Sequence, residues 1–167
     1  MDLHIRDARP ADYPAMLDIY NDVVARSTAI YCEEPGDLAF MEGYVSGREQ
    51  AGFPVLVAES AGHVTGYGSF CLFRPRPGYR FTVEHSVHVR DNRRGKGTGS
   101  AIMNALIARA KAGGYRVMIG AVDSDNAGSL EFHRRLGFEI HSALPGVGEK
   151  FGRRLDMTFV TLQLEPA

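Results

Sequence analysis

The sequence has few cysteines and no long apolar segment. Its two cysteines, Cys32 and Cys71, are not in a CxxC spacing, which favours reduced thiols over a disulfide framework. No apolar run approaches the ~18 residues that a membrane-spanning helix needs. The N-terminal residues also lack the basic start, apolar stretch and cleavage site of a secretory signal. We therefore expect a cytoplasmic protein that does not cross a membrane.

The sequence also lacks an excess of charge of either sign. Its 19 Lys and Arg residues are balanced by 20 Asp and Glu residues, for a net charge of -1. Such a chain has no overall basic field for nucleic acid or an anionic membrane, so any anion site must be local. With 44% hydrophobic residues in 167, we expect one soluble domain over 1–167 with its own core.

Short β-rich runs and helical patterns follow one another along the chain and predict an α/β fold around one mixed sheet. Strands are expected near residues 3–8, 55–58, 64–70, 81–89, 117–122, 138–142 and 156–164. Helices are expected at 15–23, at 37–50 with Asp37 as the cap, at 100–110 and at 126–136. The Gly-containing segment 60–63 predicts an antiparallel hairpin.

A glycine-rich basic segment, Arg94-Gly95-Lys96-Gly97-Thr98-Gly99, joins a predicted strand to the predicted helix at 100–110. Glycines let a backbone approach a ligand, and the first N–H groups of a helix lack partners within the helix. The helix dipole adds roughly half a positive charge at this end. A pyrophosphate is the natural occupant of such a loop, so we expect a nucleotide-like cofactor.

Two common phosphate-binding motifs do not fit this loop. A Walker A loop needs Ser or Thr after its Gly-Lys pair, but Gly97 follows Lys96. The GxGxxG pattern would need its third glycine where Ser100 or Ile102 stands. ATP and dinucleotide binding are therefore disfavoured, and a basic surface turn is the structural alternative for the loop taken alone.

The loop resembles the R/Q-x-x-G-x-G/A sequence by which GNAT acetyltransferases hold the pyrophosphate of coenzyme A. Asn126 and the segment 129–138 are similar to the second cofactor motif of that family. The segments 82–87 and 150–153 resemble the phosphinothricin and methionine sulfoximine acetyltransferase group, and the likeness extends over nearly the whole chain. The resemblance implies a central mixed, mostly antiparallel twisted sheet flanked by helices, and a homodimer.

The activity implied by this resemblance is acetyl-CoA-dependent N-acetylation by direct transfer. The acceptor would be the α-amino group of a small anionic amino-acid analogue such as phosphinothricin, methionine sulfoximine or methionine sulfone. The loop would hold the pyrophosphate, and the backbone at 87–89 would pair with the pantetheine arm. The cofactor-binding residues would be Val87, His88, Val89, Arg94, Gly95, Lys96, Gly97, Thr98, Gly99, Ser100, Asn126, Ser129 and Arg135.

Direct transfer needs a base that takes the proton of the amine. Glu84 is the candidate, directly or through water, because it is a carboxylate in a mostly apolar strand and the resembling group carries glutamate there. An ordinary salt bridge to a nearby arginine is the alternative for Glu84. By the same resemblance, His133 stands where an acid could protonate the departing thiolate, although a lone histidine on a helix is often only packed.

Strand alternation separates the side chains around Glu84. Even-numbered residues of the strand share the face of Glu84, and odd-numbered residues point the other way. His85 and His88 therefore lie on opposite faces, which discounts a metal site that they would form with Cys71.

The acceptor residues are expected around the same strand. Arginines bind carboxylate or phosphinate groups in two-pronged fashion, although each one can also be an ordinary surface charge. The resemblance places Arg74 against the acceptor, and Tyr31 in a segment, 28–31, that covers it. The predicted substrate-binding set is Tyr31, Arg74, Arg76, Glu84, His85, Ser86 and Lys150.

Two other functions stay open. Acetylation of a protein N-terminus or a polyamine would require an open or acidic acceptor groove instead of an arginine-lined pocket. A non-catalytic acyl-CoA sensor would use the same loop without turnover, and the presence of Glu84 argues against it.

Overall fold

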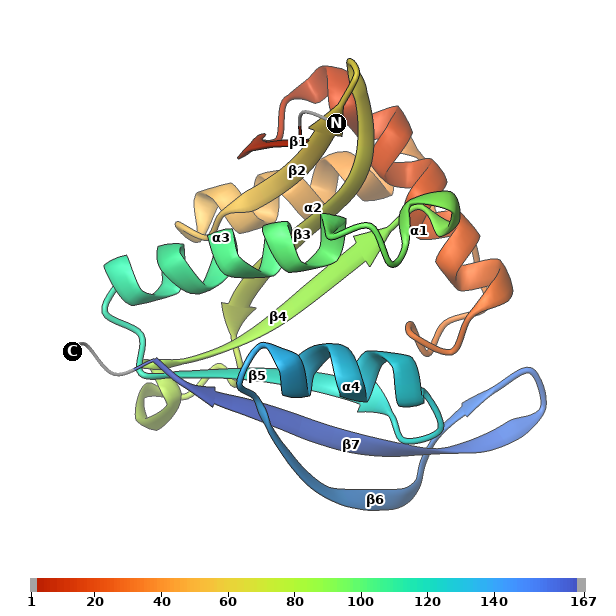
Figure 1. The fold of residues 1–167 in the computed structure, drawn as a ribbon, viewed down its shortest axis with the longest axis vertical. Helices are drawn as coiled ribbons and strands as arrows, with labels where there is room; N and C mark the ends of the chain where they lie inside the picture. The colour runs from red at the N-terminus through yellow and green to blue at the C-terminus, as the bar shows by residue number, and fades with distance from the viewer. Residues whose placement is uncertain (1–2, 165–167) are drawn as a thin grey trace.

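Seven strands form one mixed sheet in the order β1-β2-β3-β4-β5-β7-β6 (Figure 1). The computed structural model describes residues 3–164, so the ends of the predicted domain 1–167 lie outside the described residues. Among these strands only the neighbours β4 and β5 are parallel, which confirms the predicted mixed, mostly antiparallel sheet. The strands are β1 (Leu3–Asp7), β2 (Val55–Ser60), β3 (His63–Leu72), β4 (Thr82–Val89), β5 (Val117–Asp123), β6 (Glu139–Lys150) and β7 (Arg153–Gln163).

The helices flank this sheet close to their predicted positions. They are α1 (Tyr13–Arg26), α2 (Leu38–Gln50), α3 (Thr98–Ala112) and α4 (Ala127–Arg135), with short 3-10 turns η1 (Pro10–Asp12), η2 (Pro77–Tyr79) and η3 (Asp91–Arg93). Asp37 caps α2 as predicted, since its carboxylate accepts from the Phe40 N–H at 2.8 Å. Helix α3 begins at Thr98, two residues before its predicted start, because Gly97 is its N-cap.

Alternation along the central strands divides the core into two layers. Val55 and Val57 of β2 pack with α1 and α2 on one face of the sheet. Leu56 and Ala58, between them in sequence, pack with α3 and with apolar residues of α4 on the other face. The sheet therefore separates an α1–α2 side from an α3–α4 side.

The last two strands are longer than the sequence predicts. Strand β6 contains Pro145 and Gly146, which usually interrupt strands, but it lies at the edge of the sheet, where such residues are tolerated. Its pairing with β7 shifts register between Ile140 and Ala143 and again between Leu144 and Gly148, and the second shift spans these two residues. The sequence predicts a loop between the strands at 138–142 and 156–164. The structure instead has a tight hairpin turn at Phe151 and Gly152, both with positive φ.

Strands β4 and β5 pair over only three residues and then diverge (Figure 1). Pairing ends at Glu84↔Ile119, so the last five residues of β4 pair with β3 alone among the described strands. Helix α3 packs tightly behind this region: a Cβ added at Gly68 of β3 would lie 2.7 Å from Ile102. The divergence opens the sheet between the N-terminus of α3 and α4 (Figure 1).

Of the helices in residues 3–164, none has the length and apolar character required to span a membrane.

Candidate active site

The N-terminus of α3 has the backbone geometry of an anion cradle. Gly95 and Gly97 have φ values of 71° and 86°, and a Cβ at either position would meet no protein atom within 4 Å. No side chain caps the helix at Gly97. The N–H groups of the first turn, from Thr98 to Ser100, are therefore left for a ligand. The side chain of Thr98 is buried against β3, so only its backbone can contribute.

Two basic side chains of the loop make exposed contacts with their own segment. Arg94 pairs with Asp91 at 3.3 Å, and the Lys96 ammonium donates to the Asn92 carbonyl at 3.0 Å. Exposed contacts of this kind contribute little, so both side chains can turn toward a phosphate at small cost. This fits their predicted role beside the cradle.

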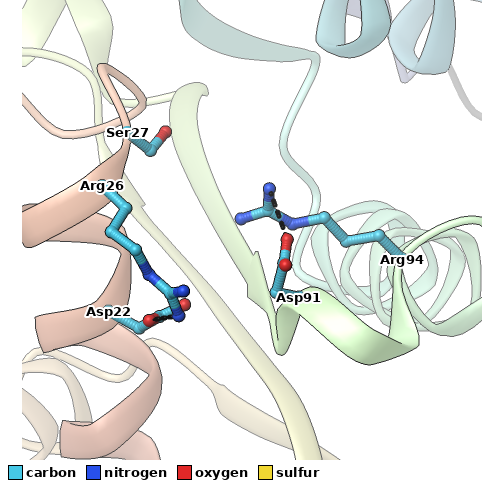
Figure 2. Close-up of a pocket in the computed structure, with 5 residues that line it drawn as sticks. All are labelled: Asp22, Arg26, Ser27, Asp91 and Arg94. Atoms are coloured by element: carbon cyan, nitrogen blue, oxygen red, sulfur yellow. Dashed lines mark hydrogen bonds and ion pairs between the residues drawn. The ribbon is translucent and has the colours of Figure 1, made fainter.

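A pocket of about 220 Å³ lies between the end of α1 and this loop (Figure 2). Its walls carry two Arg–Asp pairs, Asp22–Arg26 and Asp91–Arg94, together with Ser27. Figure 2 shows Arg94 extending from the loop toward α1. The charges of the pocket balance, so the cradle at Gly97 is the stronger anion site.

The peptide groups of β4 face alternately toward β3 and toward the opening. Those of Thr82 and Arg90 face β3, because the Thr82 carbonyl accepts from Phe73 and the Arg90 N–H donates to Thr65. By alternation, the peptide groups of Val87 and Val89 face the opening beside β5, as the predicted contact with a pantetheine arm requires.

His88 does not share this orientation. Its even number turns its peptide group toward β3, so its predicted backbone contact with the cofactor needs correction. Its ring packs against Tyr67, with centroids 5.3 Å apart, on the α1–α2 side of the sheet. Burial, with a smaller contribution from the Arg94 charge, lowers the pKa of His88 to about 4.

Glu84 lies on the α1–α2 side of β4, opposite Cys71 of β3. Its carboxylate is half-buried, and burial raises its pKa above the usual 4.5, while Arg74 and Arg48 oppose that rise. Among the ion pairs of residues 3–164, none includes Glu84, so the salt-bridge alternative is not found. The group is a carboxylate whose proton affinity is increased by its surroundings.

Helix α2 forms the wall opposite this face. The Tyr44 hydroxyl lies 3.5 Å from the Ser86 hydroxyl, and the charge of Arg48, one turn later, acts on Glu84. Arg48 was not among the predicted site residues. A signal for it exists, because Met41 and Val45 define the core-facing side of α2, and Arg48 continues that stripe.

The two arginines of the predicted acceptor set come from the segment after β3. Arg74 is exposed, and its guanidinium stacks over the Phe73 ring at 4.9 Å. Arg76 is also exposed and immediately precedes η2. Of these two, Arg74 is the one whose charge acts on Glu84.

His85 and His133 form a hydrogen-bonded pair on the other side of the sheet. His133 Nδ1 lies 2.7 Å from the Ser129 carbonyl and must carry the proton, because a carbonyl only accepts. His133 Nε2 then accepts from His85 Nε2, 3.2 Å away. Burial lowers the pKa of both rings, that of His85 to about 3.

This pair changes two predictions. Both nitrogens of His133 are engaged and the ring is held neutral, an arrangement that does not favour its predicted role as the acid. His85 points away from the side of Glu84, so its predicted contact with the acceptor needs correction. The pair instead ties β4 to α4.

Lys150 also differs from its prediction as a substrate-binding residue. Its exposed fraction is 0%, and its ammonium donates to the carbonyls of Ser27 and Ile30 at 2.5 and 2.8 Å. The ammonium also lies over the Phe151 ring at 4.7 Å. Lys150 therefore fastens the segment after α1 to the β6–β7 hairpin.

Tyr31 contributes to the same fastening. Its hydroxyl donates to the Asp156 carbonyl at 3.2 Å, and its ring lies against Gly148, where an added Cβ would come within 2.2 Å. The segment 28–31 is thus held against the β6–β7 hairpin, and Tyr31 keeps part of its ring exposed for a ligand.

The predicted cofactor residues of α4 have structural partners in this state. Asn126 caps the helix by accepting from the Ser129 N–H at 3.0 Å, and Arg135 pairs with Glu131 at 2.9 Å. A Cβ added at Gly99 of α3 would lie 3.4 Å from the Phe132 ring of α4, so the two helices approach each other here. In residues 3–164, no group of three or more His, Cys, Asp or Glu side chains is placed to hold a metal ion.

Comparisons with known proteins agree with this arrangement. Residues 16–138 match the profile described as the acetyltransferase (GNAT) family. The L-methionine sulfoximine/L-methionine sulfone acetyltransferase of Pseudomonas aeruginosa is 53% identical over 167 residues, covering 99% of this chain and 97% of that protein.

Two solved structures are similar over nearly the whole fold. A putative acetyltransferase from Salmonella typhimurium, with its cofactor acetyl-CoA, has a TM-score of 0.94 and 42% identity, covering 99% of this chain and 95% of that chain. A phosphinothricin acetyltransferase from Sinorhizobium meliloti in complex with acetyl-CoA has a TM-score of 0.93 and 36% identity, covering 98% and 89%.

Proposed function

Because this chain belongs to the GNAT acetyltransferase family, we propose that it transfers the acetyl group of acetyl-CoA to the α-amino group of a small amino-acid analogue. The acceptors are of the methionine sulfoximine, methionine sulfone and phosphinothricin type, after the substrates that name its relatives. The observation that carries the proposal is Glu84, a half-buried carboxylate with a raised pKa where β4 separates from β5.

The α3–α4 side supplies the cofactor site. Gly95, Gly97 and the first turn of α3 would hold the pyrophosphate, since the glycines leave open space and the N–H groups are uncapped. The peptide groups of Val87 and Val89 would orient the pantetheine arm along β4. Acetyl-CoA, when bound, supplies the thioester carbonyl that the amine attacks.

The α1–α2 side supplies the base and the acceptor site. Glu84 would accept the proton of the amine, directly or through water, and its raised pKa brings its proton affinity closer to that of a base working at neutral pH. Arg74 would hold an acid group of the acceptor by charge-assisted hydrogen bonds. The arginine charges around Glu84 disfavour a cationic polyamine, and a sensor without turnover would not need a carboxylate here.

We also propose that the protein is cytoplasmic, in line with its few cysteines, and that it forms a homodimer, as the family resemblance implies. Exposed apolar side chains on the β6–β7 hairpin support an interface there: Leu144, Val147 and Phe151.

The function is tested by a panel of amines assayed through thiol release. We expect turnover of methionine sulfone, methionine sulfoximine or phosphinothricin and little turnover of spermidine. Arg74→Ala should raise the KM for acidic acceptors roughly 10- to 100-fold, the worth of a charge-assisted hydrogen bond, and leave acetyl-CoA affinity unchanged.

Arg80→Ala is the matched control, because Arg80 lies in the same segment and stacks on Phe81. Its KM should stay at the wild-type value. Preferential turnover of spermidine would overturn the acceptor class, and no turnover of any amine would overturn the enzymatic function.

A further inference from the structure

Arg48 is a half-buried cation without an anionic partner. Its Nε is buried and has no hydrogen-bond partner, and its guanidinium stacks over the Tyr44 ring at 5.2 Å. No ion pair among residues 3–164 includes it. The side chain comes from the last turn of α2 and points to the face of β4 that carries Glu84.

The protein groups beside Arg48 do not neutralise it. The Cys71 thiol is the first of these, and burial raises its pKa, so it stays neutral at pH 7. Glu84 is the second, and it is close enough for the two charges to interact but is not paired with Arg48. A partly desolvated cation without a counterion costs free energy, which binding of an anion recovers.

We propose that Arg48 binds the α-carboxylate of the amino-acid acceptor. This inference rests on the proposed function, and it assigns the acceptor a second arginine beyond Arg74. The α-carboxylate is the negative charge that methionine sulfone, methionine sulfoximine and phosphinothricin share, whereas a sulfone group is neutral. The partly desolvated guanidinium of Arg48 is always charged, and it therefore matches the α-carboxylate, which is the acceptor group that is always negatively charged.

The positions of the neighbouring groups agree with this assignment. In the acceptor, the carboxylate and the amine share one carbon, and Glu84, the base for the amine, lies within the field of Arg48. The Tyr44 and Ser86 hydroxyls lie 3.5 Å apart on the same wall and supply further donors. Arg74, exposed at the rim, is left for the polar end of the acceptor side chain.

The test compares two acceptors that differ only in the carboxylate: methionine sulfone and 3-(methylsulfonyl)propylamine. Arg48→Gln should lower kcat/KM for methionine sulfone roughly 10- to 100-fold, mainly through KM, and leave the rate with the carboxylate-free amine unchanged. Arg48→Lys keeps the charge without the two-pronged geometry. Its kcat/KM for methionine sulfone should therefore lie between those of the wild type and Arg48→Gln. Acetyl-CoA affinity, measured by calorimetry, should not change in either variant.

Arg109→Gln is the matched control. Arg109 is an exposed arginine of α3 that pairs with Asp7 of β1, away from Glu84. It should behave as wild type with both acceptors. Equal loss with both acceptors in Arg48→Gln and Arg48→Lys would mean a purely structural role and overturn the inference, as would no loss with either. Failure of the wild type to acetylate methionine sulfone, methionine sulfoximine and phosphinothricin would instead overturn the proposed function, so the two failures are distinguishable.

Discussion

Among the individual residues, Glu84 has the environment that chemistry at an amine requires. Its carboxylate is held between two effects of opposite sign: burial raises its pKa, and the charges of Arg74 and Arg48 limit the rise. A carboxylate with a raised pKa binds a proton more strongly than an exposed one, which is useful in a general base.

Glu84→Gln should therefore lower kcat roughly 10²- to 10⁴-fold at neutral pH, with little change in acetyl-CoA affinity. Wild-type activity should fall as the pH drops through the raised pKa of Glu84, because the protonated carboxyl cannot accept the proton of the amine. The pH profile of kcat/KM measures this acidic limb, which should be absent in the variant. Glu42→Gln, exposed on the same wall helix, is the control, and a near-wild-type Glu84→Gln rate would move the base elsewhere.

The buried histidines, His88 and the His85–His133 pair, should contribute to how stability depends on pH. The folded-state pKa of His85 is about 3, below its usual 6.5, so below pH 6.5 the unfolded chain binds more protons than the folded one. Stability should be complete above that pH and fall toward pH 3, by at most about 1.4 kcal/mol per pH unit for each histidine.

Urea denaturation at pH 5 and pH 7.5 measures this effect. His85→Leu should reduce the difference between the two unfolding free energies, and His63→Leu, at the exposed β2–β3 turn, should not. If the unfolding free energies of His85→Leu differ between pH 5 and pH 7.5 as much as those of the wild type, the histidine pair is not the source of the pH dependence.

At the scale of elements, we expect the junction of loop and helix at Gly97 to determine cofactor binding. The residue combines positive φ with open space on the side where a Cβ would project. Gly114, at the other end of α3, has φ of 76° and equally open surroundings. Comparing substitutions at Gly97 and Gly114 therefore separates the effect of backbone strain from the effect of lost ligand contact.

Gly97→Asp should abolish measurable acetyl-CoA binding, because a side chain and a negative charge would enter the cradle. Gly114→Asp should leave binding intact. Each variant should lose a similar amount of stability, of order 1 kcal/mol, since each places a non-glycine residue at positive φ. Calorimetry and thermal melts make the comparison, and unchanged affinity in folded Gly97→Asp would contradict the cradle assignment.

The sequence predicts most elements because their signals are local. Asp37 caps α2 where the pattern places it, and the alternation of β4 correctly separates His85 from Glu84. The sequence predicts only the first part of β6, at 138–142, and misses its continuation, because Pro145 and Gly146 are tolerated only at an edge, and edge position is a property of the whole sheet. The burial of Lys150 is missed for a similar reason: its carbonyl partners are over 100 residues away.

For the whole molecule, the sheet keeps two tasks apart. The proposed cofactor groups lie toward α3 and α4, and the proposed acceptor groups lie toward α1 and α2, with β4 contributing to both. The β6–β7 hairpin holds the segment after α1 on the acceptor side through Lys150. The same hairpin carries the exposed apolar side chains that a dimer would cover.

Sedimentation should therefore give twice the 18.3 kDa mass of one chain. Val147→Lys should shift the protein toward the monomer, because it places a charge on a side chain that is 56% exposed in the single chain and buried in the proposed interface. A wild-type protein that sediments only as a monomer at micromolar concentration would refute the homodimer.

The alternation of β4 also bears on how such an enzyme can change over evolutionary time. Glu84 and Ser86 face the acceptor side, while the odd positions between and after them face α3 and α4. With the proposed site, a substitution at an even position such as Ser86 would alter which amine is accepted without touching the packing that supports the cofactor site. New acceptor preferences could thus arise by single substitutions that leave the acetyl-CoA half of the reaction intact, and one scaffold could diversify into relatives that acetylate different compounds.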